Sequence, residues 1–135
     1  MVSADNAHAM HPNYTEKTDP TNKPKLNGGI VIKYNANQHY TTDAVSGAVM
    51  RALCEKAQVP VQEYVNPSDI PGGSTLGSIA TTRLSMNTVD IGLPQLAMHS
   101  AYETAGTMDT EAFVKMAKTF FSATISYEGN GKYTF

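Results

Sequence analysis

The sequence has few of the features that mark several large classes of protein. Its one cysteine, Cys54, leaves no disulfide possible within the chain, which fits a reducing compartment. No apolar stretch approaches the roughly 18 residues that cross a bilayer, and the N-terminus has neither the charged nor the apolar region of a signal peptide. There is no basic run, and the formal net charge is -2. These absences predict a cytoplasmic protein that binds neither nucleic acid nor a membrane.

The composition that remains is that of a globular domain. The 135 residues are 41% hydrophobic and 16% charged, enough for one modest core and too apolar for a disordered tail. We therefore treat residues 1–135 as a single domain.

Hydrophobic periodicity predicts alternating strands and helices. Strands are expected where β-branched and apolar residues follow one another, at residues 30–34, 59–65 and 88–93, with an earlier strand ending near Ala4. Helices are expected after the cap candidates Thr41–Asp43, after Ser74 or Thr75, near residues 99–105, and after Asp109 or Thr110. The alternation favours an α/β fold, with a mainly parallel sheet flanked by helices in three layers.

Each predicted helix also has an expected buried side, given by apolar residues at helical spacing. These stripes are Val45, Ala48, Val49, Ala52 and Leu53 in the first helix, Leu76, Ile79, Ala80 and Leu84 in the second, and Phe113, Met116, Ala117 and Phe120 in the last. The polar and aromatic end, residues 126–135, fits no pattern.

Residues that suit a metal follow the predicted strands. Asp5, His8 and His11 come after the first strand, and His99 after the last. Parallel strands place their carboxyl ends at one edge of a sheet, so we expect these side chains to meet there, together with the loop that contains Asp69. Carboxylate and imidazole both suit zinc. The spacing alone also allows Asp5 to be a helix cap and His99 a satisfied, partly buried histidine.

Other polar residues could contact a ligand. The turn Gly72-Gly73-Ser74-Thr75 begins a predicted helix, where exposed N–H groups attract anions, although a plain turn with a serine cap has the same sequence. Lys33 interrupts an apolar strand and could present its charge to an acidic substrate or extend to solvent. Tyr40 could face a ligand or the edge of the core. Cys54 fits a buried, inert thiol. No phosphate-binding loop and no Gly-x-Ser-x-Gly motif occurs.

Four segments, in order, resemble the aspartyl aminopeptidases. They are Ser3-Ala4-Asp5-Asn6-Ala7-His8-Ala9-Met10-His11-Pro12-Asn13-Tyr14, Gly29-Ile30-Val31-Ile32-Lys33 with Gln38-His39-Tyr40, Ser68-Asp69-Ile70-Pro71-Gly72-Gly73-Ser74-Thr75-Leu76-Gly77, and Asp90-Ile91-Gly92-Leu93-Pro94-Gln95-Leu96-Ala97-Met98-His99-Ser100. The resemblance runs almost without gaps from Ser3 to about Phe121 and identifies the chain as similar to that family.

The resemblance implies a metal site. Aspartyl aminopeptidases are co-catalytic di-zinc exopeptidases that remove N-terminal aspartate or glutamate from peptides. By resemblance, Asp5 would bind one zinc and His99 the other, while His8 would stabilise the substrate carbonyl or its tetrahedral intermediate. Two zinc ions would polarise the scissile carbonyl and lower the pKa of a bridging water.

The resemblance also implies a pocket for the acidic side chain. Lys33 and Tyr40 match positions that line this pocket, and His11 and the turn Gly73-Ser74-Thr75 lie near it. A lysine in a closed pocket favours a carboxylate partner.

The family's metal centre has further members that this sequence does not contain. They are an upstream histidine, a bridging aspartate, a glutamate ligand and a glutamate that acts as general base. We therefore expect residues 1–135 to be the C-terminal portion of a metallo-aminopeptidase catalytic domain. We expect the chain to pair with the upstream catalytic segment, or with further copies as a homo-oligomer, and to be inactive alone. The alternative is a non-catalytic binding or assembly module.

Overall fold

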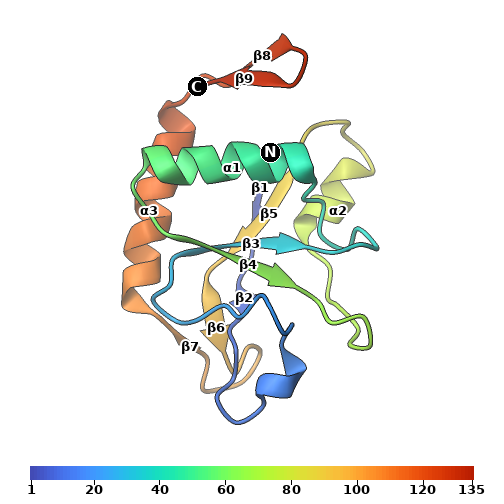
Figure 1. Ribbon diagram of the computed structural model, residues 1–135, viewed down its shortest axis with the longest axis vertical. Helices are drawn as coiled ribbons and strands as arrows, with labels where there is room; N and C mark the ends of the chain where they lie inside the picture. Colours follow the sequence, from blue (N-terminus) through green and yellow to red (C-terminus); the bar gives the residue numbers. More distant parts are fainter.

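The computed structural model describes all residues from 1 to 135, and its centre is a four-stranded sheet (Figure 1). The strands lie in the order β1 (Val2–Ala4), β5 (Val89–Gly92), β3 (Ile30–Tyr34) and β4 (Val61–Val65). The three strands predicted from β-branched runs thus share one sheet, and the predicted α/β class with parallel strands flanked by helices is confirmed.

The directions of the strands correct one expectation. β1 is parallel to β5 and β3 is parallel to β4, but β3 runs antiparallel to β5. The prediction that all the loops after strands lie at one edge is therefore wrong. The loop after β4, which contains Asp69 and the turn 72–75, leaves the sheet at the edge opposite to Asp5. Strand periodicity is the same in parallel and antiparallel pairs, so the sequence pattern did not reveal this reversal.

Helices cover both faces of the sheet. α1 (Ala44–Lys56) and α3 (Thr107–Ser122) pack on one face, and the core between them and the sheet consists of Ile30, Ile32, Met50, Cys54, Val59, Val89, Ile91, Ala112 and Met116. The short helix α2 (Leu76–Thr81) lies on the other face beside β1, where Gly77 is in contact with the side chain of Asp90. This arrangement gives the predicted three layers.

The second face of the sheet combines a small buried cluster of Ala7, Val31, Tyr40 and Tyr64 with the buried charged residues Lys33 and Asp90. Side chains alternate along a strand, so Val31 and Lys33 point away from α1 and α3, as does Asp90. In the β3–β5 register Val31 pairs with Gly92 and Ile32 with Ile91. Extending the register by one residue sets Lys33 opposite Asp90 on this face.

Helix α1 begins with the predicted cap. The backbone N–H of Ser46 donates to Asp43 Oδ1 at 2.7 Å, and the Asp43 N–H donates to Ser46 Oγ at 3.0 Å. This reciprocal pair satisfies two N–H groups at the helix start. The expected apolar stripe is shifted, because the buried residues of α1 are Ser46, Gly47, Met50, Leu53 and Cys54 and Val45 is exposed.

The stripe predicted for the second helix is also displaced, whereas that of the last helix is confirmed, because Met116 is buried and Phe113 and Phe120 pack against the core. In and after α2, Leu76, Ile79 and Leu84 are exposed rather than buried. The N-cap of α3 is Gly106, and not Asp109 or Thr110 as predicted. Asp109 is instead fully buried and accepts hydrogen bonds from the backbone N–H groups of Asn27 and Gly29, both at 2.7 Å. Asp109, which the sequence suggested as a helix cap, therefore joins α3 by hydrogen bonds to the segment just before β3.

A second, smaller sheet continues the first beyond Asp5. It contains β2 (Ala7–His8), β6 (Pro94–Leu96) and β7 (Thr104–Ala105), with β2 parallel to β6 and β6 antiparallel to β7. The predicted helix near residues 99–105 is wrong, since this segment is a turn followed by β7. Ala97 and His99 have φ angles of 54° and 68°, which a right-handed helix cannot accommodate.

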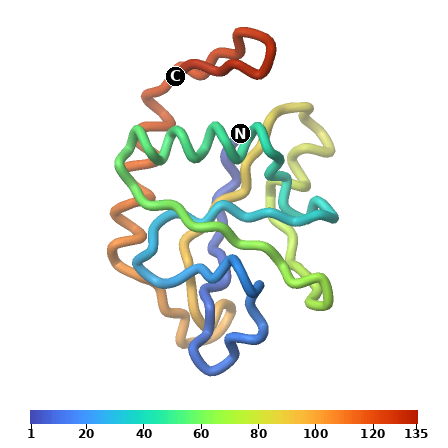
Figure 2. The backbone as a smooth tube through the Cα atoms, in the orientation of Figure 1, coloured from blue at the N-terminus to red at the C-terminus, as the bar shows by residue number.

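The C-terminal residues form a hairpin that sequence patterning left unassigned. β8 (Ser126–Gly129) pairs with β9 (Lys132–Thr134), and Figure 2 shows this hairpin beyond α1, away from the sheet. The remaining regular element is the short 3-10 helix η1 (Thr15–Lys17). No helix has the length and apolar character needed to cross a membrane.

Candidate metal and substrate site

The segment after β1 runs beside the end of β5 and the start of β6. The backbone N–H groups of Asp5, Ala7 and Ala9 donate to the carbonyls of Ile91, Leu93 and Gln95 at 3.0, 2.9 and 2.9 Å. The Asn6 side-chain amide donates to Gln95 Oε1 at 2.7 Å. Asp5 and His8 are therefore held in a fixed parallel register at the end of the sheet toward which β5 and β6 also run.

His99 lies just beyond β6 on a strained turn. Its φ of 68° is in the left-handed region, which residues other than glycine seldom occupy. Its backbone N–H donates to Glu103 Oε1 at 2.7 Å, which holds the turn in place, and its side chain is exposed. Backbone strain of this kind is concentrated at functional sites.

The surroundings of His8 show that the candidate ligands share one neighbourhood. The pKa of His8 is lowered from the usual 6.5, first by burial against the protein and then by the nearby charges of His99 and Lys33, while Asp5 acts in the opposite direction. Two residues that are 94 positions apart in sequence, Asp5 and His99, therefore both act on the same imidazole. Asp5, Lys33 and His99 therefore all contribute to the electrostatic surroundings of His8, and Lys33 contacts the backbone of Asp5 directly.

Lys33 is a buried cation at the centre of this group. Its side chain is 2% exposed, so it does not extend to solvent. Its Nζ donates to the backbone carbonyl of Asp5 at 3.1 Å and to that of Asn6 at 3.4 Å, and it lies 4.9 Å from the centre of the Tyr40 ring. No carboxylate forms an ion pair with it. An ammonium group has three N–H donors, so one remains without a protein acceptor.

Tyr64 is a member of the site that the sequence pattern did not single out. It is opposite Lys33 in the β3–β4 register, and its ring lies 6.2 Å from that of Tyr40 and 6.4 Å from that of His8. Burial raises the pKa of Tyr64, and it raises that of Tyr40 to about 12. The alternation of β4 could have placed Tyr64 on this face once its pairing with β3 was known.

His11 lies farther out, at the mouth of the site. His8, His11, Tyr14 and Tyr64 line part of an open cavity of about 320 Å³. The N–H of Asn13 donates to Nδ1 of His11 at 3.1 Å, which leaves the other ring nitrogen for a ligand or solvent.

Gly73 and Ser74 are exposed, and no hydrogen bond joins them to Asp5, His8 or His99. Their connection to the site is indirect. The next residue, Thr75, donates its hydroxyl to the buried carboxylate of Asp90, which lies opposite Lys33.

The residues present match zinc in type but not in number. Carboxylate and imidazole suit the ion. However, no group of three histidine, cysteine, aspartate or glutamate side chains is arranged to hold a metal within these 135 residues. Asp5 and His99 can therefore supply part of a metal centre but not the whole of one.

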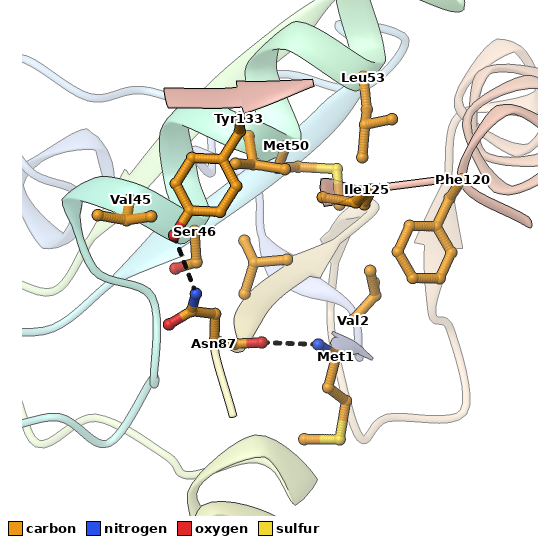
Figure 3. A pocket seen from close by; sticks show the side chains of 12 residues that line it. Met1, Val2, Val45, Ser46, Met50, Leu53, Asn87, Phe120, Ile125 and Tyr133 are labelled. Carbon is orange, nitrogen blue, oxygen red and sulfur yellow. Dashed lines mark hydrogen bonds between the residues drawn. The ribbon is translucent and has the colours of Figure 1, made fainter. Parts of the chain in front are cut away.

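The most apolar cavity is separate from this site (Figure 3). Its volume is about 260 Å³, and Met1, Val2, Met50, Leu53, Phe120 and Tyr133 are among the residues that line it. It lies near the N-terminal ends of β1 and β5, between α1, α3 and the C-terminal hairpin, whereas Asp5 and His99 follow the opposite ends of those strands. No titratable group of the candidate site lines it.

A comparison with known families assigns this arrangement. The family described as aminopeptidase I zinc metalloprotease (M18) matches residues 1–121. The chain belongs to the M18 family. Its members are zinc metallo-aminopeptidases, so the resemblance seen in the four sequence segments is confirmed at this level.

Curated relatives from the M18 family are much longer than this chain. A probable M18 family aminopeptidase 2 from Clostridium novyi is 54% identical over 122 residues, which are 90% of this chain and 28% of the relative. A protein of the same description from Stutzerimonas stutzeri is 50% identical over 123 residues, 91% of this chain and 29% of the relative. The chain spans less than a third of the length of the curated M18 relatives that it matches.

Solved M18 structures share the fold. A chain in the cryo-EM structure of the Ape4 and Nbr1 complex has a TM-score of 0.87 and 45% identity, with 89% of this chain and 23% of that chain covered. Yeast aminopeptidase 1 (Ape1), also solved as a dodecamer, has a TM-score of 0.78 and 30% identity, with 89% and 26% covered.

Proposed function

We propose that this chain supplies part of the active site of a zinc aminopeptidase that releases N-terminal aspartate or glutamate from peptides. The observation that carries the proposal is the neighbourhood of Asp5, His8, Lys33 and His99 at one end of the sheet in a member of the M18 family. The family assignment favours this function over that of a non-catalytic assembly module.

In this proposal Asp5 and His99 are ligands to two different zinc ions, and further ligands come from outside these residues. Zinc would polarise the scissile carbonyl and supply an activated water. His8 would donate a hydrogen bond to the carbonyl oxygen as negative charge develops there.

The acidic preference is assigned to Lys33. A buried cation without an anionic partner favours a substrate that brings a carboxylate, and the third N–H of its ammonium can donate to that carboxylate. The rings of Tyr40 and Tyr64 exclude water from one side of this charge, which strengthens the interaction. Gly73, Ser74 and His11 are proposed to contact the substrate around this pocket.

The exposed apolar residues beside the open edge of β1 suggest where the rest of the protein packs. Leu76, Ile79 and Leu84 are 74%, 62% and 55% exposed. We propose that they pack against the upstream catalytic segment of an M18 enzyme. A homo-oligomer is also proposed, because yeast aminopeptidase 1 forms a dodecamer.

The proposal can be tested with a hybrid enzyme, defined as the Clostridium novyi relative whose 122 matched residues are replaced by those of this chain. With zinc added, we expect it to cleave peptides that begin with aspartate or glutamate faster than matched peptides that begin with alanine. A hybrid enzyme that folds and cleaves the alanine peptide equally well would contradict the acidic preference. No metal-dependent cleavage of any peptide would contradict the aminopeptidase assignment itself.

A further inference from the structure

One buried carboxylate joins the two polar segments assigned above to substrate recognition. Asp90, in the middle of β5, is 0% exposed. Its Oδ2 accepts hydrogen bonds from the backbone N–H and the hydroxyl of Thr41 at 2.6 and 2.8 Å. Its Oδ1 accepts the hydroxyl of Thr75 at 2.5 Å. It has no ion-pair partner, so these donors compensate most of the cost of burying its charge.

The two donors belong to different segments, each next to a residue assigned to the substrate pocket. Thr41 directly follows Tyr40, whose ring contacts the ammonium group of Lys33. Thr75 directly follows the exposed residues of the turn 72–75. These segments leave the sheet after β3 and after β4, and the side chain of Asp90 is the hydrogen-bond acceptor that they share.

The packing around Asp90 fixes its position. A Cβ atom at Gly77 would lie 2.7 Å from Asp90 Oδ2 and 2.9 Å from Thr41 Oγ1. Gly77 also donates its backbone N–H to Ser3 Oγ at 3.0 Å. The first turn of α2 is therefore packed against the Asp90 carboxylate and the Thr41 hydroxyl. The carboxylate therefore cannot shift without moving the start of α2 and the Thr41 segment together.

We propose that Asp90 is a positioning residue for substrate recognition, because it sets the turn 72–75 and the segment that carries Tyr40 at a fixed distance from Lys33. The inference rests on the proposed function of these segments as the pocket for an acidic side chain. Asp90 itself need not touch the substrate. It acts through Thr41 and Thr75.

The test uses substitutions that leave the charge of Asp90 in place. Thr75→Val removes one donor and keeps the shape of the side chain, whereas Thr75→Ser keeps the hydroxyl. Thr119→Val is the matched control, since the Thr119 hydroxyl only donates to the Lys115 carbonyl of its own helix. Each variant is made in the hybrid enzyme and in the 135-residue chain.

In the hybrid enzyme, Thr75→Val should raise KM for a peptide with N-terminal aspartate several-fold, because the released turn and the Tyr40 segment would fit the acidic side chain less well. We expect kcat, and KM for the alanine peptide, to stay within about twofold of the original values, because the displacement is local to the acidic pocket. A general loss of packing would instead change these values as well. Thr75→Ser should restore the original KM. Equal effects on the two peptides, or no difference between Thr75→Ser and Thr75→Val, would overturn the proposal.

The 135-residue chain gives a second, independent measurement. If the carboxylate couples the two segments, Thr75→Val should speed hydrogen exchange of the Thr41 amide several-fold, as followed by NMR, while Thr119→Val leaves it unchanged. Should Thr75→Val fail to fold, Gly77→Ala displaces the same carboxylate with every donor retained, and the same two measurements apply. An unsubstituted hybrid enzyme with no preference for aspartate would contradict the proposed specificity. It would also remove the basis for Asp90 as a positioning residue. Unchanged Thr41 exchange in the folded variants would contradict the coupling through Asp90 alone.

Discussion

The ammonium nitrogen of Lys33 lies 3.1 Å from the backbone carbonyl oxygen of Asp5, although the residues are 28 positions apart in sequence. One side chain thus links the segment proposed to bind zinc to the pocket proposed to bind the acidic side chain. Substitution of Lys33 should therefore have two effects. The charge that recognises the acidic side chain would be lost, and so would the hydrogen bonds that hold the backbone at Asp5 and Asn6.

In the hybrid enzyme, Lys33→Met should therefore slow cleavage of both aspartate and alanine peptides, and the aspartate peptide much more. Loss of a charge-assisted hydrogen bond costs about 1.5–3 kcal/mol, or roughly ten- to a hundredfold in kcat/KM. The measured quantity is the ratio of kcat/KM for the two peptides. A ratio unchanged from that of the original enzyme would show that Lys33 does not distinguish the side chains.

Titration of His8 tests whether Asp5 and His99 are its neighbours. In the 135-residue chain, NMR should give His8 a pKa below 6.5, because burial disfavours the imidazolium and the charge of His99 adds to this effect. His99→Gln should raise the pKa of His8, and Asp5→Asn should lower it further. No change in either variant would place these residues farther apart. Since the folded chain binds this proton more weakly than the unfolded chain, the stabilising contribution of His8 is lost as pH falls below 6.5.

Tyr40 should make the chain sensitive to alkali. Its pKa is raised from 10.0 to about 12, mainly by burial. The folded chain then holds the phenol proton more tightly than the unfolded chain, so this stability is complete below pH 10 and is lost as pH rises toward about 12. Urea unfolding across that range should show a steeper loss of stability in the original chain than in Tyr40→Phe. Parallel pH profiles would show that Tyr40 titrates normally.

Asp109 should be important for stability and not for chemistry. It is fully buried and accepts the N–H groups of Asn27 and Gly29. Asp109→Ala leaves both donors without a partner and should lower the free energy of unfolding by about 3 kcal/mol, measured by urea denaturation. Asp19 is the matched control, because it also accepts two backbone N–H groups, those of Thr21 and Asn22, at a more exposed position. Asp19→Ala should cost clearly less, and equal losses would contradict the role of burial.

The sequence predicted the elements better than their arrangement. β-Branched runs located β3, β4 and β5 because period and composition are local properties. The direction of β5 relative to β3 depends on how the chain crosses between them, which periodicity does not encode. The predicted buried faces of two helices were wrong. Gly47 lets α1 approach Tyr34, and Leu76 and Ile79 of α2 face outward. Apolar spacing shows that a face exists but not what covers it.

The candidate site was predictable where motifs carried it. Asp5, His8 and His99 were singled out by residue type and by family resemblance, and Asp5 and His99 both affect the charge of His8, while their roles stay predictions. Tyr64 and Asp90 were missed because their importance comes from pairing partners across the sheet. Asp90 was visible in the sequence only as part of a matched motif, and its three hydrogen bonds depend on Thr41 and Thr75, which are distant along the chain.

The 135-residue chain alone should have no metal-dependent aminopeptidase activity, because it offers no group of three metal-binding side chains and a catalytic zinc normally has three protein ligands. The assay is cleavage of a peptide with N-terminal aspartate in the presence of added zinc, cobalt or manganese. Turnover that disappears in both Asp5→Ala and His99→Ala would show that the site within this chain is more complete than proposed.

The most direct test of the central claim is the zinc content of the hybrid enzyme, measured by mass spectrometry of the metal after exhaustive dialysis. If Asp5 and His99 bind different ions of a co-catalytic pair, the unsubstituted protein should retain about two zinc ions per chain. Asp5→Ala and His99→Ala should each retain about one or fewer, and the partly exposed control Asp19→Ala should match the original. Two ions retained in folded Asp5→Ala and His99→Ala proteins would contradict the claim that this chain supplies part of the metal centre.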